Sequence, residues 1–407
     1  MKSMILNILK NARWFFTGIL LLFGLATIDL SMNKKWAILT ILLYSLPLFL
    51  QFTRKSLVRV YGIWFGVFIL VQAILSPSIE DSFRKNDYKT LYPNLHKIID
   101  VRGDGLPGIS GRKLITTDRM GFRTSKDINY LTSDTLRIFA IGSSTTEELY
   151  LDNKETWTHH LQEKLSEYFN VNCEVINTGL SGLRARNYLA TLKEVIKYHP
   201  DLVIFMMGMT DWNRHIRMKF DNKSGPHKNL EVFIKRFSLR NTMLGKFLNN
   251  IKIRYEPIKI EHGEFFTLQR NSLSREIKYS FHPAAVSQEY RDFLDEISCV
   301  CKDMDLKCLF VTQATGYHQG AAEEFKNGFR ATPSGANYTL DFESLKYIAA
   351  LYNTYLINFA KREKVYYCDV ASKIEPSYKY LIDDCHFNEN GAKAVADIIF
   401  DCVSNIF

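Results

Sequence analysis

The sequence predicts an α/β domain with three layers, α/β/α, around a mostly parallel sheet, preceded by N-terminal transmembrane helices. Three apolar runs, at 136–142, 173–179 and 201–208, each end in a glycine and have the length of a buried strand. Helical patterns at 156–169 and 187–198 separate these runs. Continuous apolar strands alternating with helices are typical of a parallel sheet that helices cover on both faces. Long uncharged runs before residue 80 indicate the membrane part.

The second half of the chain continues this alternation. A helical pattern at 287–304 precedes the apolar run 307–313, and another at 341–363 precedes 365–370, before a last helix at 390–403. Ligands of such sheets bind at the carboxyl ends of the strands. Gly142, Gly179, Gly208 and Gln313 all fall at these ends, which places the expected site there.

Residues 1–80 are interpreted as a membrane anchor of about three helices. Residues 14–28, 36–53 and 60–79 carry no charge, and a span needs about 20 apolar residues. The first run has a signal peptide as its alternative, although no good cleavage site follows it. The second run, which contains Pro47, has a re-entrant segment as its alternative.

Charged residues beside the spans predict their orientation, because Lys and Arg favour the cytoplasmic side. Six lie before the first span or between the second and third, and two lie between the first and second. The N-terminus is therefore expected in the cytoplasm and everything after about residue 80 outside it.

The remaining chain divides into a polar lead-in segment, 81–130, with hairpin character, and the predicted α/β domain, 131–407. A stretch rich in Lys and Arg, at about 212–285, interrupts the strand and helix pattern and is interpreted as an insertion. It is either a solvated surface excursion or a cap or membrane-surface helix over the site.

Composition argues against two functional classes. The net charge of +9 includes residues that flank the spans, and no basic motif interleaved with aromatic residues indicates nucleic-acid binding. The seven cysteines show no metal-ligand spacing. Their odd number leaves at least one free thiol outside the cytoplasm unless chains are cross-linked, and no disulfide can be assigned.

Ser144 has two interpretations. It follows the first strand in "AIGSSTTE", where a serine nucleophile is expected, but Ser144 and Glu147 also match a capping box at a helix start. Near the C-terminus, Asp383 and His386 form an Asp-x-x-His pattern. A carboxylate there can fix the histidine tautomer and leave the other nitrogen as a base. The alternative is a loop anchor with Asn388 as a helix cap.

Taken in order, these motifs resemble the SGNH (GDSL-type) hydrolase superfamily over residues 136–402, which implies a flavodoxin-like fold. "AIGSSTTE" resembles the first block, "INTGLSGLRARNYL" the second, "MMGMTDWN" the third and "DDCH" the last. The resemblance implies Ser144 as nucleophile, His386 as base, Asp383 as its acid partner, and an oxyanion hole of Ser144, Gly182 and Thr210. "TDRMGFR" and "LFVTQATGY" are similar to membrane-tethered bacterial members, which implies a multi-pass bacterial inner-membrane protein with a periplasmic domain.

The chain departs from the superfamily pattern twice. Ser143 replaces the usual aspartate before the nucleophile, and Thr210 replaces the usual asparagine, an oxyanion donor whose loss typically costs about 10²–10³ in rate. Gln313 or Asn213 is hypothesised to supply the missing amide. Asp211, Arg184 and Tyr317 are further candidates for the pocket, and Arg184 has a surface ion pair as its alternative.

The resemblance implies a serine esterase that needs neither metal nor organic cofactor and acts on a glycan or lipid-linked acyl ester. One alternative is an O-acyltransferase that passes the acyl group to a polysaccharide hydroxyl and needs an acyl-donor partner protein. Another is a catalytically silent glycan-binding or assembly subunit, which the Thr210 substitution favours. The bilayer is the other expected partner.

Overall fold

The computed structural model describes residues 87–407 except 125–127, 131–133, 222–256, 261–276, 330–332, 334–335 and 337. The three predicted membrane spans and most of the 212–285 stretch lie outside these residues. In the part that is described, no helix has the length and apolar character needed to cross a bilayer. The described residues belong to one compact unit, 86–223 with 254–407.

The centre of this unit is a sheet of five parallel strands in the order β10-β8-β5-β3-β4. Each strand lies within an apolar run that the sequence predicts as a strand. The strands are β3 (Leu136–Gly142), β4 (Cys173–Asn177), β5 (Leu202–Met206), β8 (Lys307–Val311) and β10 (Tyr366–Cys368). All residues of β4 and β5 are buried, as expected for strands covered on both faces. The predicted parallel α/β fold is confirmed.

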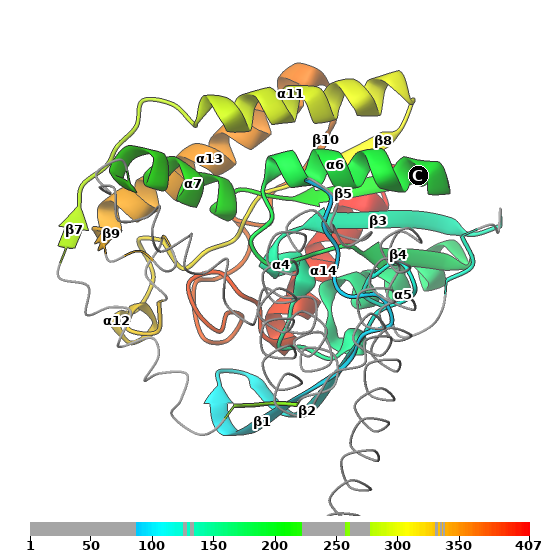
Figure 1. Cartoon of the computed structure of the whole chain (residues 1–407), viewed down its shortest axis with the longest axis horizontal. Helices are drawn as coiled ribbons and strands as arrows, with labels where there is room; N and C mark the ends of the chain where they lie inside the picture. Colours follow the sequence, from blue (N-terminus) through cyan, green and yellow to red (C-terminus); the bar gives the residue numbers. More distant parts are fainter. Residues whose placement is uncertain are drawn as a thin grey trace, which may run out of the picture. The chain divides into compact units, whose positions relative to one another are not determined.

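Helices cover both faces of the sheet (Figure 1). One layer holds α6 (Ala185–Val195), α7 (Met209–Phe220), α11 (Gln288–Asp303) and α13 (Phe342–Glu363), and the other holds α5 (Trp157–Phe169) and α14 (Glu389–Val403). The short elements are α4 (Ser144–Glu147), η2 (Asn153–Glu155), η3 (Ile196–Tyr198), α12 (Glu323–Lys326) and the paired strands β7 (Ile277–Tyr279) and β9 (Tyr338–Leu340). The predicted start of the insertion, residue 212, falls inside α7, because Trp212 and Ile216 are buried in the domain.

Two disulfides join helices to the sheet. Cys301 on α11 is bonded to Cys308 on β8, and Cys368 on β10 is bonded to Cys402 on α14. Cys173, Cys299 and Cys385 form no disulfide with the other described cysteines. Seven cysteines cannot all pair within one chain, as expected from the sequence. Which cysteines pair could not be deduced from their spacing.

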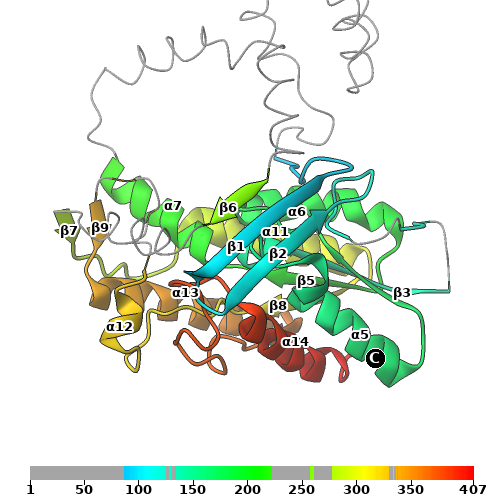
Figure 2. The same ribbon diagram turned by 90° about the horizontal axis from the view of Figure 1, so that it is seen from below.

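The segment before β3 forms a hairpin of β1 (His96–Leu106) and β2 (Ile109–Thr116), which β6 (Ile258–Ile260) extends by pairing parallel to β1 (Figure 2). Lys113 on β2 is buried, and its Nζ lies 2.6 Å from a carboxylate oxygen of both Glu155 and Glu389. At the turn, a Cβ on Gly108 would lie 2.4 Å from Asn388 Nδ2. The hairpin therefore packs directly against the start of α14.

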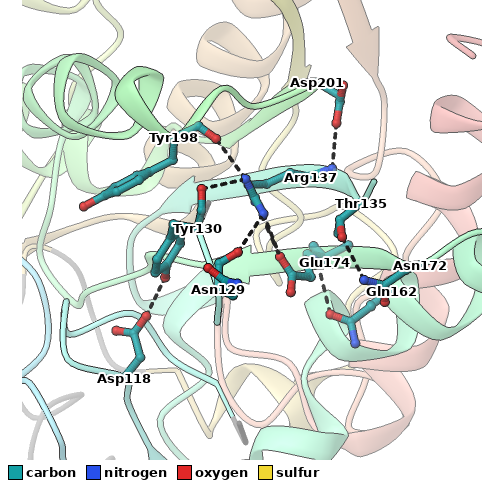
Figure 3. Close-up of polar contacts among 11 residues, drawn as sticks. Asp118, Asn129, Tyr130, Thr135, Arg137, Gln162, Asn172, Glu174, Tyr198 and Asp201 are labelled. Atoms are coloured by element: carbon teal, nitrogen blue, oxygen red, sulfur yellow. Dashed lines mark hydrogen bonds and ion pairs between the residues drawn. The ribbon is translucent and has the colours of Figure 1, made fainter. Parts of the chain in front are cut away.

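A buried ion pair lies at the amino end of β3, away from the expected site (Figure 3). The Arg137 guanidinium donates hydrogen bonds of 3.2 Å to the carbonyl oxygens of Asn129, Tyr130 and Tyr198, and lies 3.4 Å from the Glu174 carboxylate. Because each hydrogen bond ties β3 to the preceding segment or to η3, this cluster fixes the strand in place and is structural.

Candidate active site

Ser144 is the first residue of α4, immediately after the carboxyl end of β3. The turn demands glycine at position 142, since a Cβ there would lie 2.0 Å from Thr146 Oγ1. The predicted capping box is wrong. Ser143 is the N-cap and makes no side-chain cap bond, and the Glu147 carboxylate instead accepts hydrogen bonds from the N–H, at 2.6 Å, and the hydroxyl of Ser181. The Glu147 carboxylate therefore contacts the loop after β4 and not the start of its own helix.

Asp383 and His386 contact each other on the loop before α14. His386 Nδ1 lies 2.9 and 2.8 Å from the two carboxylate oxygens of Asp383. Asp383 is completely buried and also accepts the backbone N–H groups of Cys385 and His386, at 3.0 and 2.9 Å. Such a carboxylate favours the tautomer with a proton on Nδ1, which leaves Nε2 as the basic nitrogen.

Ser144 and His386 line the same cavity of about 60 Å³. Ser181 lines it too, next to the Gly182 that the resemblance places in the oxyanion hole. The remaining lining residues are Glu148, Leu149, Tyr150, Ile382 and Phe387. The fold therefore brings together three segments that are far apart in the sequence and carry the nucleophile, base and oxyanion candidates.

The two other oxyanion candidates hold hydrogen bonds within the protein. Gly182, with φ +83°, donates its N–H to Ser143 Oγ at 3.0 Å. Thr210 donates its hydroxyl to the carbonyl oxygen of Leu183 at 2.5 Å. A threonine hydroxyl has a single hydrogen to donate. An oxyanion role for either residue, which stays a prediction, requires its bond to be exchanged for one to the substrate.

Gln313, the hypothesised replacement donor, is buried beside Thr145, the residue that follows Ser144. Its Oε1 accepts the hydroxyl of Thr145 at 3.0 Å, and its Nε2 donates to the carbonyl oxygen of Ala314 at 3.0 Å. One amide hydrogen is therefore bonded to the backbone, and the side chain braces the first turn of α4.

The other candidate pocket residues brace neighbouring loops. Asp211 accepts the N–H of Ala185 at 3.1 Å, and burial raises its pKa to about 7. Arg184 forms an ion pair of 3.2 Å with Glu289. Tyr317 is buried, and its hydroxyl donates to Asp384 at 2.5 Å. Among the described residues that line the cavity at Ser144, none of these three appears.

Arg123 is a site residue that reasoning from the residues missed. Its buried guanidinium donates to the carbonyl oxygens of Glu147, Glu148 and Leu151 and to Asn153 Oδ1, with the Glu148 and Asn153 bonds both at 2.8 Å. Burial lowers its pKa to about 10. The only sequence signal was "TDRMGFR", which ends at Arg123. The side chain holds the chain in place directly after Ser144.

Replacement of Arg123 by methionine is expected to lower the free energy of unfolding by about 3–5 kcal/mol. The change leaves several buried carbonyl oxygens without donors, each at about 1–3 kcal/mol with partial compensation. Urea denaturation measures the loss. The matched control is Arg186→Met, because Arg186 pairs with Asp87 at the surface and should cost about 0–1 kcal/mol. Equal losses in the two variants would contradict a structural role specific to Arg123.

A family model described as GDSL-like Lipase/Acylhydrolase matches residues 138–399. The chain belongs to this family. This GDSL-like acylhydrolase is accordingly a serine ester hydrolase, and the match includes Ser144, Gly182, Asp383 and His386.

Several solved structures are similar to this GDSL-like acylhydrolase. A GDSL-like lipase from Bacteroides thetaiotaomicron VPI-5482 has 12% identity and a TM-score of 0.36, covering 69% of this chain and 93% of that one. An acetyl xylan esterase, Axe2, from Geobacillus stearothermophilus has 13% identity and a TM-score of 0.37, covering 67% and 95%. An α/β hydrolase from the metagenome of Lake Arreo, Spain, has 13% identity and a TM-score of 0.39, covering 68% and 99%. No curated protein matches the chain.

Proposed function

We propose that this GDSL-like acylhydrolase removes short acyl groups from cell-envelope glycans outside the cytoplasm. The proposed roles are nucleophile for Ser144, general base for His386 and orienting carboxylate for Asp383. The observation that carries the proposal is the Asp383–His386 pair, whose imidazole lines the same cavity as Ser144.

The proposed reaction is acyl transfer through the serine. His386 Nε2 accepts the hydroxyl proton of Ser144 as the oxygen attacks the ester carbonyl, and the resulting imidazolium is stabilised by Asp383. The same imidazolium then protonates the departing alcohol. Water, activated by His386, releases the acyl group from the acyl-serine and restores the free hydroxyl.

Two observations support the proposed substrate and location. A cavity of about 60 Å³ suits an acetyl group better than a long acyl chain. The disulfides Cys301–Cys308 and Cys368–Cys402 are of the kind that persists in oxidising compartments such as the periplasm. Together with the apolar N-terminal runs, they favour a periplasmic domain on a bacterial inner-membrane anchor.

The proposal is tested with the full-length protein in detergent, acting on 1-naphthyl acetate and on an O-acetylated polysaccharide. We expect acetate release from both substrates. Hydrolysis of the aryl ester alone would contradict the glycan assignment. Transfer of the acetyl group to an added sugar acceptor, in preference to water, would instead establish the acyltransferase function.

A further inference from the structure

Two adjacent buried carboxyl groups, Glu147 and Glu148, lie beside one buried cation directly after Ser144. Glu147 is 4% exposed and Glu148 is 5% exposed. Their nearest buried cation is Arg123, whose guanidinium bonds the backbone carbonyl oxygens of both residues. One buried positive charge favours one ionised carboxylate, and a second buried charge without its own partner is costly.

The surroundings of Glu147 stabilise its ionised form. Its Oε2 accepts both the N–H and the hydroxyl of Ser181. Hydrogen bonds donated to a carboxylate stabilise its charged form. Burial raises the pKa of Glu147, and the Ser181 hydrogen bonds, Arg123 and His386 all act to lower it.

The carboxyl group of Glu148 has fewer hydrogen-bond donors around it than that of Glu147. Its Oε2 accepts the N–H of Trp157 at 2.8 Å, whereas its Oε1 is buried and has no hydrogen-bond partner among the described residues. The residue is the C-cap of α4, and its left-handed conformation, with φ +50°, ends that helix directly after Glu147. Glu148 also lines the cavity that holds Ser144 and His386.

We propose that Glu148 is a substrate-binding residue, which as a neutral carboxylic acid donates a hydrogen bond from Oε1 to an oxygen of the alcohol part of the ester. A proton on Oε1 leaves Oε2 as the acceptor for Trp157, so a single protonation state accounts for both oxygens. The group it recognises is a hydroxyl-rich leaving group, such as a sugar ring. This inference rests on the proposed function.

The electrostatic surroundings support the neutral form. Burial raises the pKa of Glu148 well above its usual range, and Arg123 and the Trp157 amide lower it only in part. His386 and Tyr150 are the other titratable groups that line the cavity, and Glu147, Asp152 and Glu155 act on Arg123 together with Glu148. Because the pKa is raised, the neutral donor persists to a higher pH than in an exposed glutamate and is lost as the pH rises.

The experiment compares Glu148→Gln and Glu148→Leu in the full-length protein on two acetyl esters, 1-naphthyl acetate and a methyl glycoside bearing one O-acetyl group. Both variants are of similar size and place a non-glycine residue at φ +50°. Glutamine keeps a neutral donor and leucine removes it. For the sugar ester, we expect kcat/KM to fall about 10- to 100-fold in Glu148→Leu and less than about fivefold in Glu148→Gln.

The aryl ester distinguishes a role of Glu148 in binding the sugar from a role in holding the Ser144 turn in place. Its naphthyl group carries no oxygen besides the ester oxygen itself, so Glu148→Leu should change its hydrolysis by less than about threefold. A fall in wild-type activity on the sugar ester at alkaline pH, absent in Glu148→Gln, would support the neutral donor. Equal losses on both esters, or no loss on the sugar ester, overturns the role of Glu148 while the proposed function stands. If the wild-type protein hydrolyses only the aryl ester, the glycan assignment falls, and this role falls with it.

Discussion

Replacement of Ser144 by alanine is expected to reduce ester hydrolysis about 10⁶-fold, the typical cost of removing a serine nucleophile. Ser144 lies at the end of β3 and lines the cavity with His386, so the change removes the attacking oxygen. Initial rates of 1-naphthyl acetate hydrolysis measure the effect. The melting temperature should barely change, because Ser144 is only partly buried and the substitution keeps its backbone in α4.

The neighbouring serine provides the control for this prediction. Ser143 Oγ accepts the N–H of Gly182 and has no predicted part in bond formation. Ser143→Ala should therefore cost about tenfold, through a loosened Gly182 loop. If Ser143→Ala were as inactive as Ser144→Ala, the nucleophile would not be distinguished from its neighbour, and the assignment would fail.

Replacement of Asp383 by asparagine is expected to lower kcat about 10⁴-fold with little change in KM. The asparagine amide can donate toward Nδ1 and so favours the tautomer with its proton on Nε2, which cannot accept the serine proton. Two backbone N–H groups, of Cys385 and His386, hold the carboxylate now and would still hold the asparagine carbonyl oxygen. Steady-state kinetics on an acetyl ester give kcat and KM separately.

Asp384 is the matched control for Asp383. It is equally buried on the same loop, but its carboxylate accepts the hydroxyl of Tyr317. Asp384→Asn should lower the melting temperature and leave the tautomer of His386 unaffected. A 10⁴-fold loss of kcat in folded Asp384→Asn would show that loop geometry, and not the Asp383 carboxylate, sets the rate.

The parts of this molecule that were predictable from sequence are those that local pattern determines. β3 occupies the whole predicted run 136–142, because six of its seven residues are buried and all but Arg137 contribute to the apolar signal. The contact between Asp383 and His386 was predictable because they lie three positions apart on one loop. The strand order β10-β8-β5-β3-β4 was not, since packing of distant segments sets it.

The site residues that escaped prediction depend on such packing. Glu147 fits a local capping pattern, yet its carboxylate bonds Ser181 on the loop after β4. The hydroxyl of Thr210 bonds the carbonyl oxygen of Leu183, a contact that the sequence did not indicate, while its oxyanion role stays a prediction. Arg123 reaches the Ser144 turn from 21 positions earlier in the chain, and no spacing rule connects the two.

The hairpin of β1 and β2 extends the set of residues that the catalytic domain needs beyond the family match. The family match starts at residue 138, but Arg123 fastens the turn that carries Ser144, while Gly108 and Lys113 contact Asn388 and Glu389, directly beyond His386. One segment, 96–124, thus touches both halves of the catalytic apparatus. A chain shortened to the matched region, 138–399, would keep Ser144, Asp383 and His386. It would lose the contacts by which segment 96–124 holds the Ser144 turn and the start of α14 in place.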